Sequence, residues 1–382
     1  MARMHCYTIP LADIPAELYA LWLDRQRQDS ADPNKFTSPY YHPKYSLVVG
    51  QARHKHGLDD SYLLVGEVDG QAQCLWPHQR IGSRYGISRA TSIGQFLTDY
   101  QGPIHLNLAT SDCVPKAFLK VSGMRYFAFN HIPAAQRAFA DYAWKTSYSQ
   151  LLDLRGGYTA YKKKLGDIQG TATPGVLKKS DKFRRTIERD FTKTMGPLRF
   201  TFNSLVQADF EKLLIGKGEQ YIRSAAPHGN LIAIPWVRSV LAQLFSTQDA
   251  DFAGQLSTLH LGDTLIAAHF GIRTDTLLHY WFPWYDPAYG KYAPGLILLN
   301  ECAQAAAAQG IQAIDLGRGE QAFKLRFRTD SIPLLEGAVT RPQLLGAIET
   351  GYWKTRWMIR DSAFGKKIQT WRGASPVMQA DD

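Results

Sequence analysis

The stretch from Thr276 to Phe327 constrains the fold of this chain more than any other part of its sequence. Residues 276–282 are rich in aromatic and branched side chains and predict a β-strand. Pro283 should end that strand, because proline cannot donate a ladder hydrogen bond. Residues 296–309 are rich in leucine and alanine and predict a helix, and residues 311–316 predict a second strand. This order predicts two parallel strands joined by a right-handed crossover.

The loop that precedes the predicted helix favours an anion-binding site. Pro294 and Gly295 stand at the helix entry, where proline loses no hydrogen bond and glycine lets a ligand approach. Backbone N–H groups at a helix start can bind an anion with the help of the helix dipole, and Lys291 stands beside them. A plain crossover with a solvated loop would show a similar pattern. The many aromatic residues of the loop add weight to the binding site, and both interpretations stay open.

Three short runs in this stretch resemble one protein family. They are Tyr285-Asp286-Pro287, the run from Tyr292 to Gly295, and the run Asp315-Leu316-Gly317-Arg318-Gly319 followed by Phe323-Lys324. Together they resemble the CelD/BcsL type of acyltransferase, a branch of the GNAT superfamily named for bacterial cellulose biosynthesis. That family usually has tyrosine before the final lysine, where this chain has Phe323. The resemblance extends from about Gln255 to Val339.

The resemblance implies a fold and a domain plan. The fold class is α+β, with an α/β-like element order, in two tandem GNAT-like domains as in FemABX relatives. Each domain should be a mixed twisted sheet flanked by helices, and 382 residues suffice for two cores. The plan is an N-terminal GNAT-like domain, a basic helical connector, a C-terminal acyltransferase domain and a basic amphipathic tail, at residues 1–157, 158–199, 200–340 and 341–382.

Local patterns predict further elements. Hairpins are expected at residues 62–80, with an Asp69-Gly70 turn, and at residues 252–272, with a Gly262-Asp263 turn. Strands are expected at residues 148–154 and 198–203. Helices are expected at residues 15–27, 134–145, 208–224 and 236–248.

The resemblance also implies direct attack of an acceptor amine or hydroxyl on a thioester. We expect His269 to be the base, because imidazole titrates near neutral pH; a buried histidine bonded to a backbone carbonyl is the alternative. Asp315 should orient the base or the acceptor, and Asp286 is a further catalytic candidate. Tyr280, Tyr285 or Tyr292 could protonate the leaving thiolate. The expected cofactor-binding residues are Lys291, Tyr292, Pro294, Gly295, Leu296 and Ile297. The expected substrate-binding residues are Tyr280, Trp281, Arg318, Lys324 and Asp99.

Basic residues concentrate in the connector and the tail, and the whole chain has a formal net charge of +10. Residues 170–175 should break the connector into two helices, with Ser180 as a possible N-cap of the second. Phe183, Ile187 and Phe191 lie four residues apart and predict one apolar stripe, opposite the basic face. The connector is either a solvated helix or an anion-binding helix beside the substrate cleft.

These features set the expected ligands and location. The donor should be acetyl-CoA or a longer acyl-CoA, with a sugar or other small molecule as acceptor. No metal is expected, because His54 and His56 have no third ligand nearby. We do not expect nucleic acid to be a partner. Scattered cysteines and the absence of a signal-like start favour the cytoplasm, and the basic tail either touches a membrane or packs on its own domain.

Two other functions stay open at the sequence level. One is aminoacyl transfer from charged tRNA, as in FemABX relatives, with the basic connector following RNA phosphates. The other is a non-catalytic GNAT scaffold that holds a polysaccharide synthase.

Overall fold

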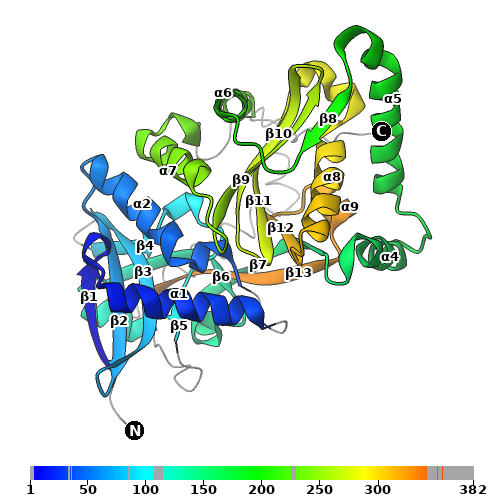
Figure 1. Ribbon diagram of the computed structural model, residues 1–382. Coiled ribbons are helices and arrows are strands. Elements are labelled where there is room, and N and C mark those ends of the chain that lie inside the picture. Colours follow the sequence, from blue (N-terminus) through cyan, green and yellow to red (C-terminus); the bar gives the residue numbers. More distant parts are fainter. Residues whose placement is uncertain are drawn as a thin grey trace. The chain divides into compact units, whose positions relative to one another are not determined.

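The computed structural model describes residues 4–32, 35, 37–84, 87–106, 115–224, 229–341, 351 and 355. Contacts divide the chain into two compact units. The first unit is Met1–Tyr148 with Ile332–Asp382, and the second unit is Ser149–Ser331 (Figure 1). Nearly all of the expected tail, residues 341–382, lies outside the described residues.

The first unit contains a mixed sheet with the strand order β1-β2-β3-β4-β6-β13. Only β4 and β6 run parallel, and the short strand β5 pairs with β3. The strands are β1 His5–Pro10, β2 Ser61–Val68, β3 Gln71–Arg84, β4 Ile87–Ser92, β5 Ile104–His105, β6 Tyr126–Pro133 and, from Ile332 onward, β13 Asp330–Thr340. Its helices are α1 Ala16–Ala31, α2 Pro43–Lys55 and α3 Pro115–Val121.

The second unit repeats this plan in the order β8-β9-β10-β11-β12-β7, and only β11 and β12 run parallel. The strands are β8 Leu198–Thr201, β9 Ala253–Leu261, β10 Thr264–Arg273, β11 Leu277–Tyr285, β12 Ala313–Arg318 and, from Ser149 onward, β7 Ala143–Asp153. Its α-helices are α4 Gly157–Gln169, α5 Gly175–Met195, α6 Gln207–Arg223, α7 Pro235–Ser246, α8 Pro294–Ala308 and α9 Ala322–Phe327.

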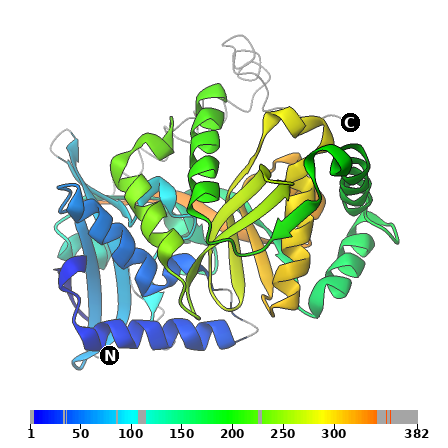
Figure 2. The same ribbon diagram turned by 45° about the horizontal axis from the view of Figure 1, so that its top comes forward.

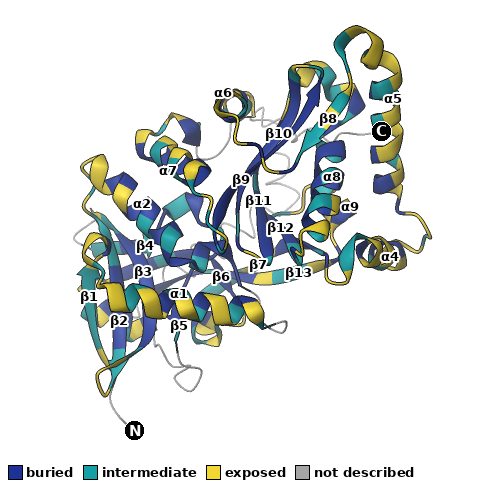
Figure 3. Cartoon of the chain, in the orientation of Figure 1, coloured by how far each residue is buried: buried dark blue, intermediate teal, exposed yellow. Residues whose placement is uncertain are grey.

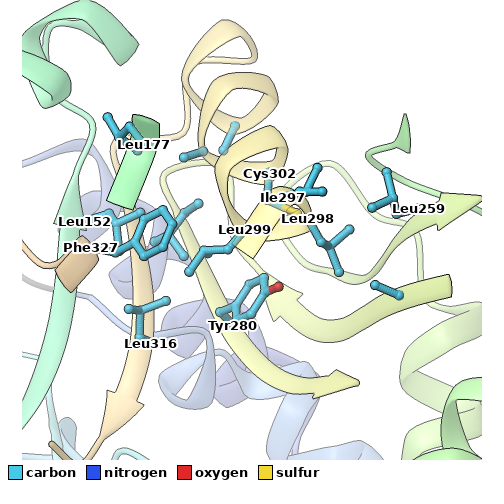
Figure 4. Packing of buried hydrophobic residues seen from close by; sticks show 14 of the residues in the cluster. Leu152, Leu177, Leu259, Tyr280, Ile297, Leu298, Leu299, Cys302, Leu316 and Phe327 are labelled. Carbon is cyan, nitrogen blue, oxygen red and sulfur yellow. The ribbon is translucent and has the colours of Figure 1, made fainter. Parts of the chain in front are cut away.

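Helices cover both faces of the second unit's sheet. Helix α8 packs on β9 to β12 with α4 and α5 against it, and α6 and α7 pack on the other face (Figures 1 and 2). Leu298, Leu299 and Cys302 project from α8 into a buried cluster that includes Ile314 and Tyr280 (Figure 4). The outward sides of α4 and α5 are exposed (Figure 3). Burial of this apolar cluster is the main source of stability for the α8 layer.

The structure confirms most of the expected elements. Both hairpins form, and Asp69 and Gly70 have the positive φ angles that their turn requires. The expected connector is two helices, α4 and α5, which lie in the second unit. The expected domain boundaries stay predictions. No helix of the described ranges is long and apolar enough to cross a membrane.

Three local predictions are wrong. Strand β11 continues through Pro283 to Tyr285, because β12 no longer pairs with it there and the missing N–H interrupts no ladder on that side. The helix expected at residues 134–145 is a 3₁₀ segment, Arg137–Tyr142, since strand β7 already begins at Ala143. Ser180 is buried inside α5, whose N-cap is Pro174.

Candidate functional site

Strands β11 and β12 pair only briefly. Their parallel ladder joins residues 277–279 to residues 313–315. Past this point β11 follows β10, while β12 follows β7 with a register shift after Asp315. We call the end of the shared ladder, at His279 and Asp315, the divergence point. It leaves the carboxyl ends of two parallel strands separated, a usual position for ligand sites in such sheets.

A β-bulge on β11 lies just past the divergence point. Phe270 pairs with Phe282 and Ile272 pairs with His279, so Tyr280 and Trp281 both lie opposite Gly271. A Cβ atom at Gly271 would collide with the His279 carbonyl oxygen, so only glycine allows this close approach. A bulge bends the strand that carries it, and this one begins where pairing with β12 ends.

A buried histidine–aspartate pair occupies the divergence point. His279 Nδ1 lies 3.6 Å from Asp315 Oδ2, and both residues are at most 1% exposed. The other carboxylate oxygen, Oδ1, accepts hydrogen bonds from the Ser149 hydroxyl at 2.6 Å and the Gly317 N–H at 2.7 Å. These bonds fix the carboxylate, so that it can orient the imidazole. The expected role of Asp315 as an orienting group therefore fits its geometry, with His279 as its partner.

The pair projects away from α8. Side chains alternate along a strand, and the preceding residues, Leu278 and Ile314, belong to the core beneath α8. His279 and Asp315 therefore point to the face covered by α6 and α7. An acceptor that reached the pair would approach from this face.

His269, the expected base, is fully buried beneath α8. Its ring stacks on Tyr280 with centroids 3.8 Å apart, and its Nε2 accepts the Trp281 N–H at 3.2 Å. Burial, together with the nearby His279, holds the pKa of His269 well below its ordinary value, and burial raises the pKa of Tyr280. The Nε2 lone pair of His269 is already engaged. This geometry suits a structural role, and His269 as the base stays a prediction.

The start of α8 has the features expected of an anion site. Ala293, its N-cap, adopts the left-handed conformation at φ 46°, and Pro294 occupies the first turn. In the described part of the chain the Gly295 N–H has no hydrogen-bond acceptor. A Cβ atom on Gly295 would meet only the Tyr285 ring, at 3.6 Å, so the space beside its Cα is otherwise open. A phosphate group would fit there.

Other expected cofactor residues differ in what they offer. Lys291 is exposed, with Nζ 4.9 Å from the centre of the Tyr292 ring. Tyr292 itself is 9% exposed and packs edge-on against Phe191 of α5, and Ile297 is buried in the same core. Only backbone groups of Tyr292 and Ile297 could contact a ligand. Leu296 is half-buried, and its N–H bonds to the Ala293 carbonyl.

The remaining expected residues lie in three places. Asp286 caps the 3₁₀ segment Pro287–Tyr292 by accepting the Ala288 N–H at 3.0 Å, which is a structural use of its carboxylate. Trp281 and Arg318 are half-buried on β11 and β12 beyond the divergence point. Asp99 lies in the first unit, 3.5 Å from His131 Nε2.

Lysines flank the carboxyl ends of both strands. Lys217 of α6 is buried and donates to the Pro283 carbonyl at 2.9 Å, and Lys324 of α9 donates to the Arg318 carbonyl at 2.9 Å and the Gly317 carbonyl at 3.3 Å. Burial, and then the charge of Lys324, lower the pKa of Lys217 to about 8. Lys324 was expected here as a substrate-binding residue; Lys217 was not.

Sequence analysis missed Lys217, His279 and Ser149. The signal for Lys217 was present, because two glycines flank it in the middle of a helix where glycine is unfavourable. His279 lies in the strand predicted at residues 276–282, and no local pattern links it to Asp315. Ser149 is remote in sequence from Asp315, and no local pattern links them.

Among the described residues, no group of His, Cys, Asp and Glu side chains could hold a metal ion. In comparisons with known proteins, residues 179–325 match the family described as Acetyltransferase (GNAT) domain. The matched residues make up most of the second unit. They contain the divergence point, the start of α8 and both lysines.

Solved structures share the fold over most of the chain. The C-terminal domain of a protein described as a lysylphosphatidylglycerol synthetase from Agrobacterium fabrum is 13% identical, with a TM-score of 0.50 over 91% of this chain and 98% of that one. FemX is 9% identical, with a TM-score of 0.50 over 86% and 98%. A tandem GNAT protein from the clavulanic acid biosynthesis pathway is 9% identical, with a TM-score of 0.46 over 88% and 98%. A search of curated protein sequences gave no match. The expected fold class, mixed sheets flanked by helices in a GNAT-like arrangement, is confirmed.

Proposed function

We propose that this chain is an acyltransferase that uses an acyl-CoA donor and transfers the acyl group at the divergence point of β11 and β12. The observation that carries the proposal is the buried His279–Asp315 pair, set where the parallel strands part inside a GNAT-type domain. A base held by a fixed carboxylate is what deprotonation of an acceptor requires.

The start of α8 fits the donor. The free Gly295 N–H and the positive end of the helix dipole suit a pyrophosphate, and the exposed Lys291 adds a cation. Acyl-CoA supplies an activated thioester, and these residues would hold its phosphate groups. The expected cofactor residues would thus act mainly through the Gly295 N–H, because Pro294 has no N–H and the Leu296 N–H bonds to the Ala293 carbonyl.

The proton steps belong to side chains of the same unit. His279 Nε2 would accept the proton of the acceptor amine or hydroxyl as the new bond to the acyl carbon forms. Asp315 would stabilise the resulting imidazolium across the 3.6 Å contact. The C–S bond then breaks, and the leaving thiolate needs a proton. Tyr285, which is 42% exposed beside the start of α8, would give it.

The finer assignment rests on the resemblance of residues 285–295 and 315–324 to the CelD/BcsL type. In this proposal the enzyme transfers an acetyl group to a nitrogen or oxygen atom of a sugar-like acceptor. The reaction would belong to cell-surface polysaccharide biosynthesis and take place on the cytoplasmic side of the membrane. Membrane contact through residues 341–382 remains part of this proposal.

Isothermal titration with acetyl-CoA, butyryl-CoA and palmitoyl-CoA tests the donor. We expect one to bind with micromolar affinity, and its chain length would identify the acyl group. Free thiol released from that donor in the presence of candidate sugars then tests turnover. A folded protein that binds none of the three would refute the proposal.

One surface favours a second candidate, transfer from aminoacyl-tRNA. Exposed basic residues recur at helical spacing along one side of α5, at Lys178, Lys182, Arg185, Arg189 and Lys193. Salt-dependent binding of deacylated tRNA, lost when Lys182 and Arg185 are replaced by Gln, would support this donor. Equal binding by the double variant and the unchanged protein would exclude this surface as its site.

A further inference from the structure

Lys217 is a buried ammonium group bonded to neutral acceptors. It is 9% exposed, and its Nζ donates to the Pro283 carbonyl at 2.9 Å and to Gln220 Oε1 at 3.0 Å. The Tyr221 ring centre lies 5.3 Å away. In the described ranges no carboxylate forms a salt bridge with it, and one of its three N–H donors has no oxygen acceptor. Buried charges without a counterion are rare, since desolvation makes them unfavourable.

The sequence around Lys217 is arranged to bring it against β11. A Cβ atom at Gly216 would collide with the Trp284 indole of β11, and one at Gly218 would lie 3.0 Å from Asn230 Nδ2. Each glycine weakens the helix by about 1 kcal/mol relative to alanine. Both are explained by close packing of α6 on β11 and on the segment that follows α6, which sets the Lys217 ammonium at the strand's carboxyl end.

Lys324 holds the matching position on the neighbouring strand. Its bonds to the carbonyls of Gly317 and Arg318 place a second ammonium group at the carboxyl end of β12. The two lysines are close enough that the charge of Lys324 contributes to lowering the pKa of Lys217. The two ammonium groups therefore lie at the carboxyl ends of neighbouring strands, where an anion between them would be attracted to both.

We propose that Lys217 and Lys324 form an anion clamp, which binds a phosphate or carboxylate group carried by the acyl acceptor. This inference rests on the proposed acyl transfer at the divergence point. Lys217 reaches β11 from α6, on the face to which His279 and Asp315 project, so an acceptor anchored by the clamp lies on the side of the proposed base. The donor's phosphates have their own position at the start of α8.

The clamp can be tested without knowledge of the full acceptor. The full chain is first titrated with CoA and kept saturated, so that the donor's phosphate-binding groups are filled. Inorganic phosphate and, separately, acetate are then titrated at pH 7 and followed by calorimetry. We expect one of the two anions to bind. The anion with the higher affinity identifies the charged group that the acceptor carries.

Four variants distinguish binding by the clamp from a general effect of positive charge. Lys217→Met should weaken anion binding about tenfold or more, the effect of losing a charge-assisted hydrogen bond, while Lys217→Arg should retain most of it. Lys324→Met should weaken it similarly, and it serves if Lys217→Met does not fold. Lys212→Met is the matched control, because Lys212 also lies on α6 and donates to a backbone carbonyl, that of Leu265 at 3.1 Å. It should leave anion binding unchanged.

Each result has one meaning. CoA binding without binding of either anion overturns the clamp and leaves the acyl-CoA proposal intact. Anion affinity that is the same in Lys217→Met as in the unchanged protein also overturns it. Lys217-dependent anion binding in a protein that does not bind CoA would instead support the clamp and refute the donor.

Discussion

The two units share one strand plan but differ where their parallel strands part. In each unit a run of antiparallel strands ends in one parallel pair, which is followed by an antiparallel strand from elsewhere in the chain. Both parallel ladders join three residues of each strand. The last pair is His279 with Asp315 in the second unit and Thr91 with Ala128 in the first. The fold therefore repeats, while the titratable pair occurs only once at this position.

The surroundings of the parallel pairs differ as well. In the first unit Trp76 lies 4.1 Å from Phe118 of α3 and 4.9 Å from Phe127, between ring centres, so aromatic packing fills the layer. In the second unit the longer helix α8 packs over a layer that contains the buried His269 ring, stacked on Tyr280. The comparison teaches that the shared ladder supplies a scaffold, and that the residues at its last pair decide whether the scaffold carries chemistry.

Replacing the residues of the last pair should give the largest difference between the units. His279→Gln should lower acyl-CoA-dependent turnover about 100-fold or more, since glutamine cannot accept a proton. Thr91→Val, the matched change in the first unit, should leave turnover within about twofold. Thiol release measures both, with circular dichroism as the folding control. Equal losses in the two variants would remove the functional distinction between the units.

A charge at the start of α8 should act on donor binding. Gly295→Glu should weaken acyl-CoA binding about tenfold or more, because a carboxylate beside the free N–H repels phosphate. Gly175→Glu is the control, since it adds the same charge to the exposed start of α5, where a Cβ meets no atom within 4 Å. Calorimetry with CoA compares them. Undiminished affinity in folded Gly295→Glu would place the donor elsewhere.

Acid should destabilise both units through buried histidines. Burial lowers the pKa of His78 in the first unit to about 4 and that of His269 in the second well below its ordinary 6.5. Below pH 6.5 the unfolded chain binds protons that the folded chain cannot, so stability falls as the pH drops towards 4. Each histidine should contribute about 1.4 kcal/mol per pH unit.

Urea unfolding from pH 7 to pH 4.5 checks this slope, and replacing either histidine by Gln should remove its share. His269→Gln should also leave turnover far less affected than His279→Gln does. A 100-fold loss of turnover in a stable His269→Gln protein would restore His269 as the base.

The smallest expected effect concerns Lys217 and stability. The folded pKa of Lys217 lies below its unfolded value, so folding at neutral pH buries a charge that favours the unfolded state. Lys217→Met should therefore be neutral or stabilising by about 1 kcal/mol, and the parent should gain stability relative to it between pH 8 and pH 10. Lys212→Met should show no such pH dependence. A strongly destabilised Lys217→Met protein would mean that the bond to Pro283 is structural.

Much of the fold could be predicted from local sequence. Turn residues predict the hairpin at Gly262-Asp263, and turn residues with side-chain periodicity predict the end of a helix near Gly170. Pro283 was misjudged because its cost depends on whether a neighbouring strand is present, which is a tertiary property. The helix expected at residues 134–145 failed because β7 begins at Ala143.

The site could be predicted only in part. The start of α8 was found because proline and glycine at a helix entry are a local signal. The partnership of Asp315 with His279 depends on the parallel register, and their face depends on strand alternation through a bulge at Tyr280. Lys217 reaches the strand end only because α6 crosses β10 and β11. The spacing of residues in the sequence does not predict such long-range contacts.

Hydrogen–deuterium exchange with and without acyl-CoA tests the central claim most directly, because it reports on both units in one experiment. The claim is that the donor binds at the separated strands of the second unit. Peptides covering residues 277–297 should become protected on binding, while those covering residues 87–106 should not change. Protection of residues 87–106 with no change in residues 277–297 would contradict the account.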